Sequence, residues 1–186
     1  RAIRFIAVRD GAGASYSQVV SATGGAGTLN LTVSSGSLPP GIGIAPLGNA
    51  IVLFGTSFEV GTFNFTITAT DVNGQTGSRA YTLTIAAPTL TLTPAAGTLT
   101  APYAVLYTQT FTASGSAAGV YTYVLTGPLP TGLTFSGDTL SGIPTAPGSY
   151  PITVTATDTL VTGTGAPFSI TQNYTLNVPA PTIVVN

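Results

Sequence analysis

The chain has 186 residues, of which four are Arg, five are Asp or Glu, and none is Lys, His, Cys, Met or Trp. Without Cys and His it can form neither a disulfide nor a Cys/His metal site. Without Lys it lacks the amine of a Schiff base, and most nucleophile–base pairs of enzymes are missing too. With four Arg and a net charge of −1 it cannot neutralise a row of phosphates, which argues against nucleic-acid binding.

The remaining composition predicts an all-β protein. Thr contributes 34 residues, Gly 23 and Pro 14, and the stretches between the Gly and Pro residues are rich in Val, Ile, Thr, Phe and Tyr. Thr, Ser, Gly or Pro interrupts every apolar stretch before it reaches about 18 residues, so no membrane span is expected. A scaffold or a binding module is therefore favoured over an enzyme.

The first ten residues hold three of the four basic side chains, Arg1, Arg4 and Arg9. A solvated first strand explains such a segment. The alternative is an end of the protein that docks against an acidic or glycan partner.

Two copies of one unit follow each other along the chain. Residues 16–24 return as 107–115, and residues 38–42 return as 129–133, both 91 positions later. Residues 55–71 match 142–158 at an offset of 87, and residues 81–85 match 174–178 at an offset of 93. The repeat predicts two domains, residues 1–87 and residues 88–181, with length differences in loops. Pro88 at the junction predicts a semi-rigid joint.

Apolar side chains alternate with polar ones in both copies, which predicts strands with one face in a core and a Thr-rich face in water. The expected inward rows are Phe63, Phe65, Ile67 and Ala69; Tyr81, Leu83 and Ile85; Tyr150, Ile152, Val154 and Ala156; and Tyr174, Leu176 and Val178. Around residues 120–125 the register stays open, because Tyr and Val occupy both parities. Short strands with Gly and Pro turns predict two tandem antiparallel β-sandwiches.

Several motifs in fixed order resemble the Putative Ig domain, a repeat of bacterial or archaeal surface proteins related to cadherin-like and dystroglycan-type Ig domains. They are residues 36–42 (Gly-Ser-Leu-Pro-Pro-Gly-Ile) and 69–74 (Ala-Thr-Asp-Val-Asn-Gly) in copy one, and residues 129–133, 142–144 and 156–158 in copy two. Copy one has Ser57 where that family has Pro, and copy two lacks the Asn-Gly after Asp158. The resemblance implies Ig-like sandwiches that act as spacers in secreted or surface proteins, without catalytic residues.

Asp71 and Asp158 stand at equivalent strand ends, followed in copy one by Asn73. In cadherin-like domains such Asp residues bind Ca²⁺, so these three residues are weak calcium candidates. A Ca²⁺ site needs six to eight oxygens, usually with several carboxylates, and the acids here are scattered. The favoured interpretation is that each Asp closes a turn by accepting backbone N–H groups. No cofactor is expected.

Two further features of the sequence bear on glycan binding and glycosylation. Tyr and Phe could stack on sugars, but most of them fall on the inward rows and are predicted to lie in the core. Asn30, Asn64 and Asn173 each begin an Asn-x-Thr triplet, which is a glycosylation acceptor but arises easily in a Thr-rich chain.

The chain ends on a further strand signal, formed by Thr182, Ile183, Val184, Val185 and Asn186. These five residues align with residues 89–93, the expected first strand of copy two, at the offset of 93. They are therefore expected to be the first strand of a further repeat, or a donor strand that inserts into a neighbouring subunit. Head-to-tail contact of that kind builds open filaments.

The expected function is mechanical: a non-enzymatic extracellular protein that is a subunit of a surface filament, pilus-like or fimbrial, or a spacer in a surface array. Self-association by strand addition is the expected contact. The alternative is an adhesin segment or a carbohydrate-binding accessory module of a secreted protein, with glycans as partners.

Overall fold

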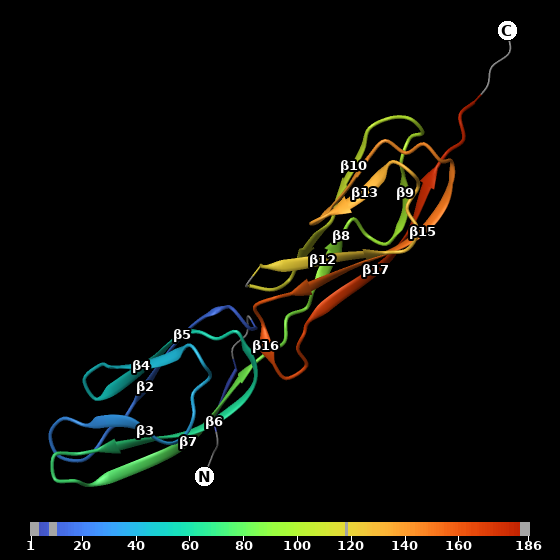
Figure 1. The fold of residues 1–186 in the computed structure, drawn as a ribbon. Helices are drawn as coiled ribbons and strands as arrows, with labels where there is room; N and C mark the ends of the chain where they lie inside the picture. The colour runs from blue at the N-terminus through green and yellow to red at the C-terminus, as the bar shows by residue number, and fades with distance from the viewer. Residues whose placement is uncertain (1–3, 8–10, 118, 183–186) are drawn as a thin grey trace. The chain divides into compact units, whose positions relative to one another are not determined.

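A computed structural model describes residues 4–7, 11–117 and 119–182, with side chains from residue 11 onward. This part of the chain contains strands and turns but no helix, and therefore no helix that is long and apolar enough to cross a membrane. It divides into two compact units (Figure 1). The first comprises Arg1–Pro88, Ser116–Ala118 and Leu160–Ala166, and the second comprises Thr89–Gly115, Gly119–Thr159 and Pro167–Asn186. The all-β prediction is confirmed.

In the first unit one sheet has the order β1-β7-β6, with β3 and β16 both paired to β6, and the other has the order β2-β5-β4. The β1–β7 and β16–β6 pairs are parallel, and the rest are antiparallel. The strands are β1 (Arg4–Ala7), β2 (Ser15–Ser21), β3 (Asn30–Gly36), β4 (Ile42–Pro46), β5 (Ala50–Thr56), β6 (Glu59–Thr70), β7 (Thr76–Ile85) and β16 (Thr162–Gly163).

The second unit repeats this plan with one addition. Its larger sheet has the order β12-β15-β17-β9, and β10-β14-β13 and the β11–β8 pair form the rest. The strands are β8 (Thr91–Thr93), β9 (Gly97–Thr100), β10 (Tyr107–Thr110), β11 (Thr112–Ser114), β12 (Tyr121–Thr126), β13 (Leu133–Ser136), β14 (Thr139–Gly142), β15 (Gly148–Asp158) and β17 (Ser169–Val178). The chain therefore enters this unit through β8, paired to β11, and then crosses to the larger sheet as β9.

The predicted inward rows form the two cores. Phe65, Ile67 and Leu83 are at most 4% exposed in the first unit, as are Ile152 and Leu176 in the second. Outward hydroxyls bond across the strands instead. Thr68 Oγ1 lies 2.6 Å from Ser34 Oγ and 2.8 Å from Ser78 Oγ. Burial of the apolar rows stabilises each sandwich, at about 1.5–3 kcal/mol for a large aliphatic or aromatic side chain.

The register that the sequence left open is settled on β12. Tyr121, Tyr123 and Leu125 pack against the core of the second unit, while Val124 is 58% exposed. Tyr123 also forms a hydrogen bond, because its hydroxyl oxygen accepts the Ala113 backbone N–H at 2.9 Å. The row with Tyr121 and Tyr123 faces inward because the rings pack in the core and the Tyr123 hydroxyl finds a backbone N–H as its partner.

Paired glycines explain why the Leu-Pro-x-Gly motif recurs with a second glycine downstream. Gly142 has φ 138°, and a Cβ there would collide with the carbonyl oxygen of Gly132. Gly55 stands in the same relation to Gly41. The two backbones approach closely enough for the Ile143 N–H to donate to the Gly132 carbonyl at 3.0 Å. The motif therefore fixes a turn onto a neighbouring strand, and a side chain would prevent that approach.

Candidate functional site: an open groove beside strand β2

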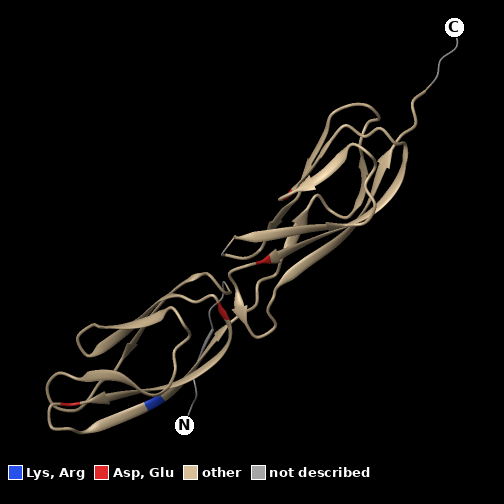
Figure 2. Cartoon of the chain, in the orientation of Figure 1, with Lys and Arg blue, Asp and Glu red and all other residues tan. Residues whose placement is uncertain are grey.

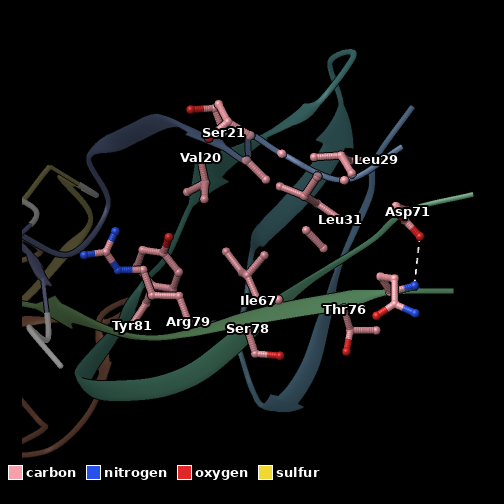
Figure 3. Close-up of a pocket in the computed structure, with 17 residues that line it drawn as sticks. Val20, Ser21, Leu29, Leu31, Ile67, Asp71, Thr76, Ser78, Arg79 and Tyr81 are labelled. Carbon is pink, nitrogen blue, oxygen red and sulfur yellow. Dashed lines mark hydrogen bonds between the residues drawn. The ribbon is translucent and has the colours of Figure 1, made fainter. Parts of the chain in front are cut away.

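A groove of about 470 Å³ opens between the two sheets of the first unit (Figure 3). On one side it is lined by the end of β2 and the loop that follows, residues 20–25, and on the other by β7. Its floor is apolar, because Leu29, Leu31 and Ile67 lie there and are each at most 6% exposed. In the part of the chain that the structure describes, β2 is an edge strand of its sheet.

The corresponding place in the second unit is filled by β8. Residues 21–23 correspond to Thr112–Ser114 of β11, and β8 pairs antiparallel with those three residues. The central residue of β8, Leu92, is 3% exposed and packs in the core with Phe111 and Tyr174. Among the described residues, β2 pairs only with β5, so no described strand takes the place of β8 in the first unit.

Two equivalent glycines show the difference at atomic scale. In the second unit, a Cβ at Gly115 would collide with the carbonyl oxygen of Thr89, just before β8. At Gly24, its counterpart, a Cβ would meet no described atom within 4 Å. Both glycines have positive φ, 102° and 93°, so the backbone turns alike in both units. The groove of the first unit is thus shaped for a strand that the described residues do not supply.

The backbone of β2 is oriented to pair with such a strand. The Ala22 N–H donates to the Asn49 carbonyl at 2.9 Å, toward the strands of its own sheet. Successive residues of an extended chain point their N–H and C=O groups to opposite sides, so those of Ser21 and Thr23 face the groove. They correspond to Thr112 and Ser114, the residues that oppose the outer two residues of β8.

Asp71 closes one end of the groove. Its Oδ2 accepts the Ala26 N–H at 2.9 Å, and its Oδ1 accepts the N–H groups of Gln75 at 2.8 Å and Asn73 at 2.9 Å. These bonds, those from Ala26 and Gln75 above all, hold the pKa of the Asp71 carboxyl below its usual value, although burial acts in the opposite direction. The carboxylate thereby ties the loop after β2 to the β6–β7 turn at this end of the groove.

Replacing Asp71 with Asn is expected to lower the urea midpoint of the first unit near neutral pH, because the amide would present a donor to a backbone N–H. The folded pKa lies below the ordinary value of 3.8, so the carboxylate stabilises the fold above that value. This contribution is lost as the pH falls through the folded pKa. The gap between wild type and D71N in urea titrations should therefore narrow in acid.

The control for that experiment is D138N, which alters an exposed carboxylate whose Oδ1 accepts only the Thr139 hydroxyl at 2.7 Å. It should leave the midpoint nearly unchanged at every pH, as surface substitutions usually do. A D71N effect of constant size from neutral to acid pH would contradict the role given to the carboxylate.

The calcium candidates are placed as follows. Asp71 and Asn73 share one turn in the first unit, where both Asp71 oxygens accept backbone N–H groups. Asp158 ends β15 in the second unit and is 3% exposed, and its N–H donates to the Phe168 carbonyl at 2.9 Å. Among the described residues no three His, Cys, Asp or Glu side chains gather where they could hold a metal ion, and the acids are scattered (Figure 2). Calcium binding stays a prediction.

The other predicted site residues do not gather at one place. Arg4 begins β1, whereas Arg1 and Arg9 lie outside the described residues. Asn30, Asn64 and Asn173 are exposed on β3, β6 and β17. Asn64 Oδ1 accepts the Thr82 hydroxyl at 2.7 Å, and Asn173 Oδ1 accepts the Thr153 hydroxyl at 2.9 Å. In the C-terminal segment, residues 182–186, Thr182 is exposed and the other four residues lie outside the described part.

Sequence reasoning missed the groove and the outer face of the β2-β5-β4 sheet. On that face Val19 and Phe54 are each 48% exposed, and Val52 lies directly opposite Val19 and two residues before Phe54. The matching face of the second unit carries only hydroxyl side chains: Thr108, Thr110, Thr134, Ser136, Thr139 and Ser141. The sequence shows that Val19 and Phe54 are apolar, but it does not show that they lie on the outer face of the sheet.

The profile of the Putative Ig domain matches residues 6–86 and again residues 88–179. The chain belongs to the Putative Ig domain family. The resemblance inferred from the motifs is thereby confirmed, and the Ig-like sandwich is the fold of both copies.

Curated relatives of this Putative Ig domain protein include the serine-rich adhesin for platelets of Staphylococcus aureus strain MRSA252. It is 30% identical over 137 residues, which are 72% of this chain and 10% of the adhesin. The same adhesin of strain MW2 is also 30% identical over 137 residues, here 6% of its length. The chain thus spans a tenth or less of the curated relatives it matches.

Solved structures with a similar arrangement include titin domains Z1Z2 in complex with telethonin. That structure has a TM-score of 0.47 at 15% identity and covers 97% of this chain and 93% of its own. Chicken VE-cadherin EC1-2 has a TM-score of 0.40 at 12% identity, covering 95% of this chain and 97% of its own.

Proposed function

We propose that this chain is a non-enzymatic structural segment of an extracellular surface protein, and that its units join to other copies by β-strand addition. Membership of the Putative Ig domain family and the similarity to a bacterial adhesin support a structural or adhesive role at the cell surface. The open groove beside β2 is the observation that carries strand addition, because an edge strand with an apolar floor beside it is what such a contact needs.

The lack of charged side chains at the edge of β2 supports the same proposal. Charged side chains are a common protection of exposed strand edges against unwanted pairing. Ser21, Ala22 and Thr23 line the edge of β2 without one, and the C-terminal segment has none either. An edge and a strand that both lack this protection are suited to pair with each other. Repetition of the contact from copy to copy would give a filament.

Deleting residues 182–186 is expected to abolish assembly. We expect the full chain to form head-to-tail fibres at high concentration, visible by negative-stain electron microscopy and as fast-sedimenting material in the ultracentrifuge. The shortened chain should sediment as a monomer, because the strand that would add to a neighbour is gone.

The matched control keeps the length of the tail and changes only its chemistry, by replacing residues 182–186 with Gly and Ser. It should behave like the deletion, since a Gly/Ser segment is flexible and buries little apolar surface. Fibres that persist in both variants, or a full chain that stays monomeric at all concentrations, would overturn assembly by strand addition.

Adhesion is the second candidate function, and the apolar outer face with Val19 and Phe54 favours it. An uncharged face with an exposed aromatic ring suits stacking on a sugar or packing on a protein partner. Retention of the full chain on a glycan column, lost on replacement of Phe54 with Ala, would separate this function from assembly, which does not use that face.

A further inference from the structure

We propose that the groove of the first unit receives the C-terminal segment of a second copy in one register: antiparallel to residues 21–23, with the side chain of Val185 on the apolar floor. This inference rests on the proposed assembly by strand addition and adds the acceptor, the direction and the register. The second unit supplies the template, because it shows how a strand of this repeat sits in such a groove.

The repeat offset transfers that template residue by residue. Asn186, Val185 and Val184 correspond to Thr93, Leu92 and Thr91 of β8. In the second unit these three residues oppose Thr112, Ala113 and Ser114. The counterparts of the latter in the first unit are Ser21, Ala22 and Thr23. Val185 is therefore expected to oppose Ala22, and Val184 to oppose Thr23.

The pattern of burial fits this register. Leu92 is buried, whereas Thr91 and Thr93 on either side are exposed. In the tail, Val185 takes the buried position. Beneath it the floor of the groove offers Leu31 and Ile67, and Tyr81 lines its far side (Figure 3). Ala113 under Leu92 is 7% exposed, while its counterpart Ala22 is only half-buried, as expected of a residue whose covering strand is not in place.

The first unit also has more room for the strand than the second. Phe111, fully buried beside β8, corresponds to Val20. The smaller side chain leaves space on the β2 side of the groove, which a β-branched Val185 can occupy. At the buried position the tail has the β-branched Val185 where β8 has Leu92.

Engineered cysteines can test the register, since the chain has no cysteine of its own. Thr91 Oγ1 and Ser114 Oγ lie 2.7 Å apart on the outer face of the β8–β11 pair. This separation brings their Cβ atoms within reach of a disulfide. The corresponding pair between copies is Thr23 and Val184. The full chain carrying T23C and V184C should therefore convert on mild oxidation from monomer to a ladder of covalent dimers, trimers and higher oligomers.

The matched control carries T23C with V185C. Its second thiol would point to the floor of the groove, away from residue 23, so the ladder should be absent. A ladder of equal strength in both variants would overturn the register. A link formed within one chain, seen as a monomer with changed mobility on a non-reducing gel, would overturn the second copy as the occupant.

Gly24 provides an independent arm. Adding G24A to the linked pair should suppress the ladder, because the new Cβ would meet the carbonyl oxygen of the incoming Thr182, as one at Gly115 would meet that of Thr89. Adding G48A instead should leave the ladder intact. Gly48 also has positive φ, 59° against 93° at Gly24, and open surroundings, so G48A carries a backbone penalty of the same kind. Suppression by both variants alike would contradict the blocking role of Gly24.

Failure of this inference is distinguishable from failure of the proposed function. If the wild-type chain forms fibres and the T23C/V184C chain remains unlinked, the strands add at another place and only the register is wrong. If the wild-type chain forms no fibres and the cysteines remain unlinked, both proposals fall.

Discussion

Replacing Phe111 with Ala is expected to destabilise the second unit by about 3–5 kcal/mol, the usual cost of removing a buried Phe side chain. Phe111 is fully buried at the centre of that unit. Its ring packs edge-on against Tyr174, with centroids 5.3 Å apart, and against Phe135 at 6.1 Å. Because a domain of this size is stable by only about 5–15 kcal/mol, the second unit should approach global unfolding.

Thermal unfolding followed by calorimetry measures this effect. The two units have separate cores, so the transition of the second should fall sharply while that of the first stays in place. The control is F54A, which removes an aromatic ring of equal size that is 48% exposed. It should change stability by no more than about 0.5 kcal/mol. Similar losses in the two variants would contradict the central position of Phe111.

Replacing Gly142 with Ala should cost about 2–5 kcal/mol, through two effects that add. The positive φ of 138° disfavours any L side chain, at roughly 1–2 kcal/mol. The new Cβ would also strike the Gly132 carbonyl oxygen, and relief requires the two strands to separate at a cost of roughly 1–3 kcal/mol. The loss should appear as a lower urea midpoint of the second unit.

Gly137 separates these two effects. It lies in the same unit with φ 60°, and a Cβ there would meet nothing within 4 Å. G137A should therefore show the backbone penalty alone, about 1 kcal/mol. If G137A and G142A lowered the midpoint equally, the close approach of Gly142 and Gly132 would have no energetic weight.

Much of the fold was predictable because the signals are local. Alternation along residues 63–69 follows from the two-residue period of a strand, and it holds wherever the strand is placed. The motifs with Gly41 and Gly132 recur because each turn needs a residue without Cβ at one spacing. The role of Asp71 in a turn was also readable, since its partners Asn73 and Gln75 follow within the same turn.

Features that depend on distant residues were not predictable in this way. The third partner of Asp71 is Ala26, 45 positions earlier in the chain. The register of Tyr121 and Tyr123 was settled by which row found room in the core. Likewise β16 pairs in parallel with Glu59 and Val60 of β6. The sequence of residues 160–166 contains no pattern that predicts pairing with β6.

The sequence by itself determined the two Ig-like copies, their inward rows, the shortage of charge, and the likeness of the C-terminal segment to β8. These depend on periodicity and on comparison of the chain with itself. Only the tertiary structure decided that the first unit has an open groove where the second holds a strand. A groove exists only where β2, β6 and β7 meet across the sandwich, and which residues meet there depends on the packing of the sheets rather than on local order.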